Sequence, residues 1–142
     1  MRILVAFLAC FLGFVAVPPA AHAQAEAPDP GAIQNVIGGQ LEAFRGDDGA
    51  KAWSYAAPNI QLIFPSPDSF MAMVRKGYPP VYRPRSWKFG ALETKDGLIA
   101  QSVEIVGPDG DYWQALYTIA RQPDGSWKIT SCHLIKSEGS SA

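Results

Sequence analysis

The residues best suited to chemistry are a cysteine and a histidine that are adjacent in the chain, Cys132 and His133. An imidazole takes up and releases protons near neutral pH, so His133 is the candidate proton carrier. Cys132 could act as a nucleophile only with a base such as His133. Both lie in a strand-like segment, where neighbouring side chains point to opposite faces, so this pairing is geometrically poor. Two structural alternatives stay open, a histidine that hydrogen-bonds within the sheet and a small buried thiol.

Metal and cofactor chemistry have little support in the sequence. It contains two histidines and two cysteines, and one of each lies near the N-terminus. There is no phosphate-binding glycine loop, no cysteine pair at zinc spacing and no G-x-S-x-G nucleophile elbow. A metal site would have to combine His133 with carboxylates that no regular spacing brings together. We therefore expect no metal and no cofactor.

Tyrosines and arginines cluster in a proline-rich segment that contains Tyr78, Tyr82, Arg83 and Arg85. Prolines fix this backbone, and two arginines with two phenols could receive a carboxylate or another anionic group at a pocket mouth. In the alternative, the arginines cover aromatic rings and the tyrosines attach the segment to the helices. Aromatic residues from other segments complete the candidate ligand-binding set, which is Tyr55, Tyr78, Tyr82, Arg83, Arg85, Trp113, Tyr117 and His133.

The composition is that of a globular protein, with 142 residues, 48% hydrophobic and 18% charged, and a formal net charge of −1. These values exclude long disorder and a strongly basic nucleic-acid surface, so we expect no nucleic-acid partner. The length fits one domain. We place this domain at residues 30–136, between a disordered leader at 24–29 and a disordered tail at 137–142.

Residues 1–23 have the pattern of a cleaved signal peptide. A short basic start precedes an apolar run over residues 3–17, and Ala21-His22-Ala23 supplies the small residues that a signal peptidase recognises. The run is shorter than the roughly 20 residues that span a bilayer, although an uncleaved anchor is the alternative. We expect a periplasmic or secreted protein with no membrane attachment after cleavage. Cys132 is then the only cysteine, so no intrachain disulfide forms.

Two helices are predicted at the start of the domain. Asp29-Pro30 has the form of an N-cap followed by proline in the first turn, and Gly46 ends this helix. Asp47 or Asp48 caps a second, shorter helix that ends before Pro58. One apolar stripe of the first helix consists of Ile33, Val36, Ile37, Gln40, Leu41 and Phe44.

The next segments are less regular. Residues 59–64 fit either a short strand or a helical turn, because periodicity cannot decide at this length. Ser66-Pro67 begins a further helix, which Gly77 ends. The prolines of Tyr78–Arg85 exclude helix and central strand, so we expect an extended, ordered loop there.

Strand alternation follows Arg85. Asp-Gly pairs end at Gly97, Gly110 and Gly125, and they separate four segments as hairpin turns do. We therefore expect an α+β domain in which N-terminal helices pack on a curved four-stranded antiparallel meander. The expected strands are Ser86–Thr94, Leu98–Val106, Asp111–Ala120 and Ser126–Ile135.

Both faces of this sheet carry apolar residues, whereas the helices can cover only one. We therefore expect a homodimer built on the other sheet face. In the last strand, alternation places Trp127, Ile129, Ser131, His133 and Ile135 on one face, and Lys128, Thr130, Cys132 and Leu134 on the other. A β-bulge would reverse this assignment.

The segments GYPPVYRP at Gly77–Pro84 and DGSWKITSCHL at Asp124–Leu134, in a chain with helices before strands, resemble the nuclear transport factor 2-like (cystatin-like) superfamily. Within it, the chain resembles a group of secreted bacterial proteins with a domain of unknown function. The resemblance implies a cone-shaped α+β barrel with a pocket between helices and sheet, often paired into dimers. Isomerases, dehydratases, cyclases and binding modules share that fold, so it does not fix the function.

Two functions remain. The first is an exported module that binds a small apolar or weakly anionic ligand, or a protein partner. The second is a small isomerase or lyase in which His133 is the general base in the cone pocket and Tyr55 or Tyr117 donates a hydrogen bond. The resemblance implies an aspartate or second histidine deep in an enzyme's pocket, whereas the strand acids here lie in turns or at strand ends. The missing partner favours the binding module.

Overall fold

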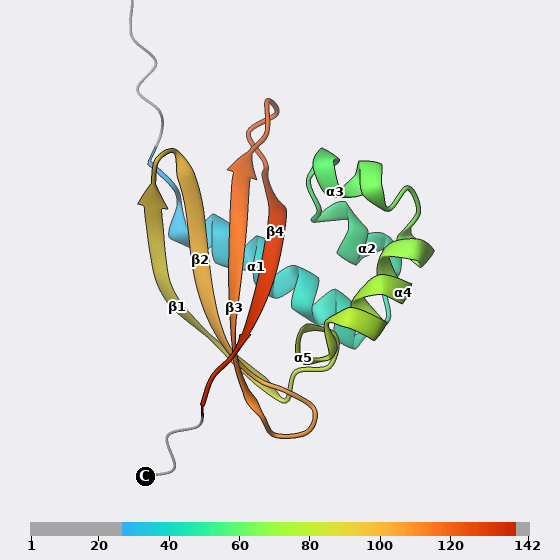
Figure 1. Cartoon of the computed structure of the whole chain (residues 1–142). Helices are drawn as coiled ribbons and strands as arrows, with labels where there is room; N and C mark the ends of the chain where they lie inside the picture. Colours follow the sequence, from blue (N-terminus) through green and yellow to red (C-terminus); the bar gives the residue numbers. More distant parts are fainter. Residues whose placement is uncertain (1–26, 139–142) are drawn as a thin grey trace, which may run out of the picture.

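The computed structural model describes residues 27–138, in which helices precede strands along the chain (Figure 1). The expected α+β class is confirmed. The predicted signal peptide lies outside the described residues, as do residues 24–26 of the leader and 139–142 of the tail. Within the described range, no helix is both long and apolar enough to cross a membrane. The elements are α1 (Pro30–Arg45), α2 (Gly49–Ser54), α3 (Pro58–Ile63), α4 (Pro67–Gly77), α5 (Pro79–Tyr82), β1 (Ser86–Lys95), β2 (Leu98–Val106), β3 (Tyr112–Arg121) and β4 (Trp127–Lys136).

Helices α1, α2 and α4 begin where their capping residues predict. The Asp29 carboxylate accepts hydrogen bonds from the backbone N–H groups of Gly31 and Ala32, at 3.0 and 3.2 Å. Asp48 caps α2 and Ser66 caps α4 in the same way. Each cap provides a partner for N–H groups that the first turn of a helix leaves free.

Two short helices lie where the sequence predicted none or left the choice open. Residues 58–63 form α3. The prediction of an extended loop over residues 78–85 is wrong, because residues 79–82 form α5. Pro79 and Pro80 occupy the first turn of α5, where the missing N–H has no helical partner to lose. The N–H groups of Val81 and Tyr82 both donate to the carbonyl of Tyr78, at 3.0 and 2.9 Å.

The four strands form one antiparallel sheet in the order β1-β2-β3-β4, as expected. The first and last residues of each strand differ from the predicted ones by at most one position. The glycines of the three turns, Gly97, Gly110 and Gly125, have φ values of 78°, 88° and 86°. That conformation is open to glycine at little cost, which explains where the chain reverses.

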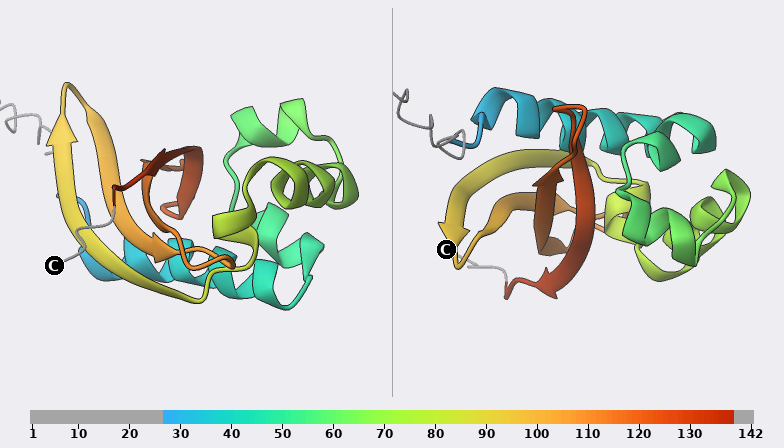
Figure 2. Two further views of the ribbon diagram at one scale, coloured as in Figure 1. Left: turned by 60° about the horizontal axis from the view of Figure 1, so that its bottom comes forward. Right: turned by 90° about the horizontal axis from the view of Figure 1, so that it is seen from above.

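Helix α1 crosses one face of the twisted sheet, and α2–α5 gather beyond the β4 edge (Figure 2). The covered side of the sheet and the facing stripe of α1 form the core. On α1 the buried apolar residues are Ile33, Ile37, Leu41, Ala43 and Phe44. On the strands they are Val103, Ile105, Ala115, Tyr117, Ile119 and Ile129.

A β-bulge changes the predicted faces of β4. Thr118 pairs with Ser131, but the next residue, Ile119, pairs with Ile129, so Thr130 is an extra residue. The prediction that Ile129 shares a face with Ser131, His133 and Ile135 is therefore wrong. Ile129 is buried on the helix-covered face, and beyond the bulge this face continues with Cys132 and Leu134. His133 and Ile135 are exposed and lie on the opposite face.

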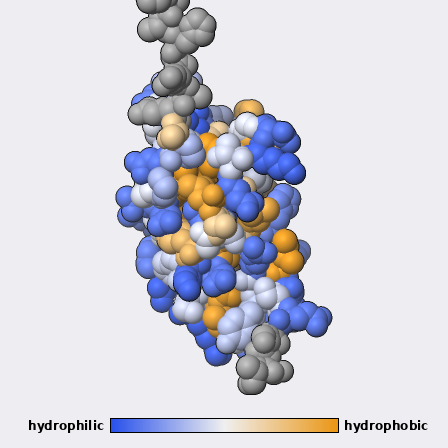
Figure 3. All heavy atoms as spheres, turned by 90° about the vertical axis from the view of Figure 1, so that its left-hand side faces the viewer, coloured by the Kyte–Doolittle hydropathy of each residue, from blue (hydrophilic) through white to orange (hydrophobic). Residues whose placement is uncertain are grey.

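No described helix packs on the opposite sheet face, which we call the open face. It carries exposed apolar residues, including Leu98 and Ile135, which are 65% and 52% exposed. Figure 3 views the molecule from the β1 side and shows apolar side chains in separate patches among hydrophilic ones. A homodimer through the open face stays a prediction.

Candidate functional site

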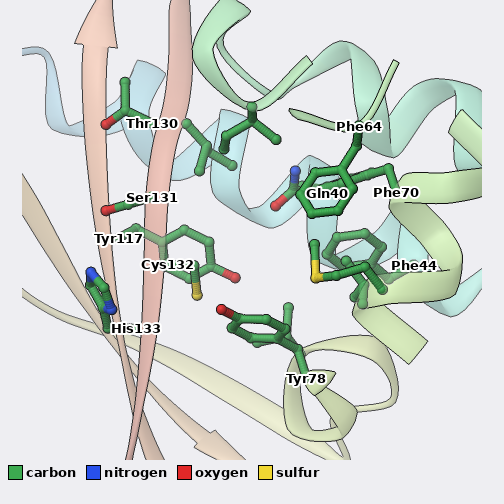
Figure 4. Close-up of a pocket in the computed structure, with 15 residues that line it drawn as sticks. Gln40, Phe44, Phe64, Phe70, Tyr78, Tyr117, Thr130, Ser131, Cys132 and His133 are labelled. Carbon is green, nitrogen blue, oxygen red and sulfur yellow. The ribbon is translucent and has the colours of Figure 1, made fainter. Parts of the chain in front are cut away.

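A cavity of about 230 Å³ lies between the sheet and the helices α1, α3, α4 and α5 (Figure 4). Its wall is mostly aromatic and aliphatic, with a few uncharged polar groups. The lining residues are Gln40, Phe44, Ile60, Phe64, Phe70, Met73, Val74, Tyr78, Val81, Tyr117, Ile129, Thr130, Ser131, Cys132 and His133. A small concave site of this composition is typical of pockets for small molecules.

Tyr117 provides the most unusual polar group of this wall. It lies in the middle of β3, where alternation directs it to the covered face, and it is 0% exposed. Its hydroxyl has no oxygen or nitrogen partner among the described residues, and the polar group beside it is the Cys132 thiol, a weak hydrogen-bonding group. Burial raises the pKa of this phenol well above its usual value, and the nearby Cys132 thiol adds to the effect. The group therefore stays a neutral hydroxyl that can donate one hydrogen bond and accept others.

Cys132 pairs with Tyr117 across β3 and β4, and its sulfur lies on the cavity side of the strand (Figure 4). The thiol is free. Burial raises the pKa of Cys132 to about 12, although the nearby Tyr117 hydroxyl acts in the opposite direction. Because thiolates are the reactive form, this cysteine is a poor nucleophile at neutral pH.

Two polar side chains reach the cavity from the helical side. Tyr78, between α4 and α5, directs its hydroxyl toward Tyr117 and Cys132 (Figure 4). Gln40 lies on the buried stripe of α1, and its Nε2 donates to the carbonyl of Ala52 at 3.1 Å. That bond fixes the amide and leaves its oxygen as the free end.

The hydroxyls of Thr130 and Ser131 at the bulge are already paired. Thr118 Oγ1 lies 2.7 Å from Thr130 Oγ1 and 2.5 Å from Ser131 Oγ. Tyr117 is the fully buried polar group of the cavity wall without an oxygen or nitrogen partner among the described residues.

Backbone contacts hold the helical side of the cavity against β4. The N–H of Ile129 donates to Tyr55 O at 2.9 Å, and the N–H of Ala57 donates to Ile129 O at 2.8 Å. The indole N–H of Trp53 donates to Phe64 O at 2.9 Å, which positions α3 and the Phe64 ring. The cavity is therefore built on well-connected elements and needs no rearrangement to exist.

Residues 26–142 match the model of a family described as Domain of unknown function (DUF4864). The chain belongs to this family. Searches of curated proteins and of solved structures found no match for the DUF4864 domain. Its function therefore has to be argued from the site itself.

Of the residues predicted for ligand binding, the DUF4864 domain brings Tyr78, Tyr117 and His133 to the cavity. His133 borders it, but the residue is exposed and is preceded by the inward-facing Cys132. No described side chain forms a hydrogen bond or ion pair with the imidazole. Among the described residues there is also no group of three metal-ligating side chains.

Tyr82 and Arg83 bind the protein itself, away from the cavity. Arg83 Nη2 lies 2.7 Å from Asp47 Oδ2, and the Tyr82 hydroxyl donates to the other oxygen of that carboxylate. Arg83 also donates to the carbonyl of Phe44 and stacks 4.0 Å from the centre of the Tyr82 ring. The Tyr82 hydrogen bond, and then Arg83, hold the pKa of Asp47 below its usual value. This arrangement attaches α5 to the end of α1.

The other predicted residues are also outside the cavity. Arg85 Nε donates to Pro108 O at 3.1 Å, in the turn between β2 and β3. Trp113 lies near the start of β3, and its buried indole N–H has no described partner. Tyr55 ends α2, and its hydroxyl packs against Gly39 of α1.

Most of the cavity wall was not among the predicted site residues. The apolar lining comes from α1, α3 and α4, where these residues were indistinguishable from ordinary core. Gln40 offered a usable signal, because a polar residue in an apolar helical stripe is buried with a specific partner.

Proposed function

We propose that this domain binds a small, mostly apolar molecule in the cavity between α1, α4 and the β3–β4 pair. The observation that carries the proposal is the buried Tyr117 hydroxyl at the cavity wall, which has no oxygen or nitrogen partner and only the Cys132 thiol beside it. Buried polar groups are nearly always hydrogen-bonded, and an unpaired one costs about 1–3 kcal/mol. A bound molecule with a hydrogen-bonding atom would remove that cost while it buries its apolar part.

The resemblance to nuclear transport factor 2-like proteins supports the same function, since it implies a pocket between helices and sheet. The cone shape and the superfamily relation belong to this proposal. So does export, which follows from the signal-like residues 1–23. The preference for a binding module over an isomerase or lyase rests on His133, because its side chain is exposed and lacks an acidic partner among the described residues.

Binding can be tested with cumene, a neutral apolar probe, and methyl NMR of the full chain. We expect cumene to shift the methyl resonances of Met73 and Ile129, which line the cavity. Leu62 and Ile63 provide internal controls, because they are 83% and 68% exposed on α3. Shifts confined to these two, or no shift at all, would contradict the proposal.

A His133→Ala variant separates the two functions. If the domain is a binding module, the His133→Ala chain still binds cumene, because the rest of the cavity lining is intact. A measurable isomerase or lyase turnover that disappears in His133→Ala would instead establish the enzyme.

A further inference from the structure

From the polar end of the cavity, we infer that the ligand is an uncharged molecule with an oxygen acceptor, such as a carbonyl or hydroxyl, on a compact apolar body. This inference rests on the proposed function and specifies its ligand class. Three observations carry it: a lining without lysine, arginine, aspartate or glutamate, the Tyr117 hydroxyl without an oxygen or nitrogen partner, and the cavity volume.

No lysine, arginine, aspartate or glutamate lines the described cavity. Arg83, which the sequence suggested as a partner for an anionic ligand, is paired with Asp47 and the carbonyl of Phe44. A charged ligand would therefore lose its hydration without gaining a counter-charge, which is strongly unfavourable. This argument applies to anions and to cations, since no carboxylate faces the cavity either.

Two side chains of the cavity wall, Cys132 and Tyr117, show the same preference for a neutral form. Burial raises the pKa of Cys132 to about 12 and that of Tyr117 well above its usual value, so both are held in their neutral forms. The environment that disfavours negative charge on these two groups also disfavours it on a bound molecule.

The polar groups converge at one place. Figure 4 shows the Tyr117 and Tyr78 hydroxyls and the Cys132 sulfur directed toward a shared region of the cavity. The hydroxyls of Thr130 and Ser131 are engaged with Thr118. The Tyr117 hydroxyl has only the Cys132 thiol, a weak acceptor, beside it, so an oxygen acceptor placed there would give it a stronger hydrogen bond.

The volume sets the size of the apolar body. A cavity of about 150 Å³ accommodates benzene in another protein, and this one measures about 230 Å³. The aromatic rings of Phe44, Phe64 and Phe70 form much of the surrounding wall. A single ring with a short substituent fits that space.

Four probes with equal numbers of heavy atoms test the inference: acetophenone, which carries a carbonyl acceptor, cumene, which has none, benzoate, an anion, and benzamidine, a cation. Dissociation constants are measured by methyl NMR at about pH 8. We expect acetophenone and cumene to bind, and both charged probes to bind at least about 10-fold more weakly than acetophenone.

Tyr117→Phe removes only the hydroxyl. We expect this variant to weaken the binding of acetophenone by about 2- to 10-fold, the range of one hydrogen bond. The affinity for cumene should be unchanged or higher. Tyr112→Phe is the matched control, because Tyr112 is an exposed β3 residue outside the cavity. Tyr78→Phe, at a half-buried site, gives a second measurement if the Tyr117 variant does not fold.

The outcomes separate the two proposals. If no probe binds, the binding function itself fails. If cumene binds but benzoate or benzamidine binds as tightly as acetophenone, the domain is a binding module and the neutral-ligand inference is overturned. Equal weakening of acetophenone and cumene by Tyr117→Phe would also overturn it, since the hydroxyl would then act only through the fold.

Discussion

Tyr117 and Cys132 are direct neighbours across the β3–β4 pair, and both side chains enter the same cavity. A shift of one residue in the pairing would turn one of them to the opposite face. The Thr130 bulge sets this relationship, because it changes the register of β4 between Ile129 and Ser131. The site therefore depends on a local irregularity of the sheet.

The burial of Cys132 predicts low thiol reactivity. Because burial raises its pKa to about 12, we expect a Cys10→Ser chain to react with a disulfide reagent at least about 100-fold more slowly when native than when denatured, at neutral pH. The native rate should still be rising with pH where an ordinary thiol is already ionised. Absorbance kinetics would measure both, and equal native and denatured rates would contradict the burial.

Local signals explain the parts of the fold that the sequence predicted. The Asp29 cap acts on N–H groups two and three residues away, and the Asp-Gly turns act on their own backbone. Such contacts need no knowledge of the rest of the molecule. The antiparallel meander then follows, because short turns join consecutive strands.

Non-local contacts explain what the sequence missed. The Thr130 bulge is defined by its pairing with β3, and Arg83 meets Asp47 only after the helices pack. Because this pairing is remote in sequence, the arginine was assigned to a ligand. The cavity likewise exists only where four helices and two strands meet, so composition gave no sign of its wall.

The Asp47 contacts predict an acid-dependent loss of stability. Tyr82 and Arg83 lower the pKa of this carboxyl below its usual value of 3.8. Its stabilising effect is therefore fully present above pH 3.8 and is lost as the pH falls through the lower, folded-state pKa. We expect Asp47→Asn to lower the melting temperature at neutral pH, with the difference from the wild type shrinking in acid.

Asparagine suits this test because Asp47 has a φ of 52°, a conformation that asparagine also adopts. As a second measurement, Tyr82→Phe removes the hydrogen bond with the largest effect, so NMR titration should show the Asp47 pKa moving up. A difference in melting temperature that stays constant through acid pH would show that charge is not the cause.

The open sheet face predicts the oligomeric state. Leu98, Tyr112 and Ile135 are large, exposed residues on a face that no described helix covers. We expect a homodimer at micromolar concentration by sedimentation, and a shift toward monomer in Ile135→Lys, because a charge would be buried at the interface. Leu62→Lys on α3 is the matched control and should sediment as the wild type does. A monomeric wild type would refute the dimer.

Two adjacent glycines of α1 predict opposite effects of the same substitution. A Cβ at Gly38 would lie 3.7 Å from the Phe89 ring, an ordinary contact. We therefore expect Gly38→Ala to stabilise the domain by about 0.5–1 kcal/mol, the usual gain for alanine in a helix. A Cβ at Gly39 would lie 2.5 Å from the Tyr55 hydroxyl oxygen and 2.7 Å from the ring carbon that bears it, so the ring must move.

Movement of Tyr55 has a further cost, because its carbonyl accepts the Ile129 N–H that joins the helices to β4. We expect Gly39→Ala to be less stable than Gly38→Ala by about 1–3 kcal/mol, as for other overpacked sites, in urea unfolding. The double variant with Tyr55→Leu should lose less than the sum of its single changes, because the two residues are in contact. Additive effects would show that Tyr55 is not the obstacle.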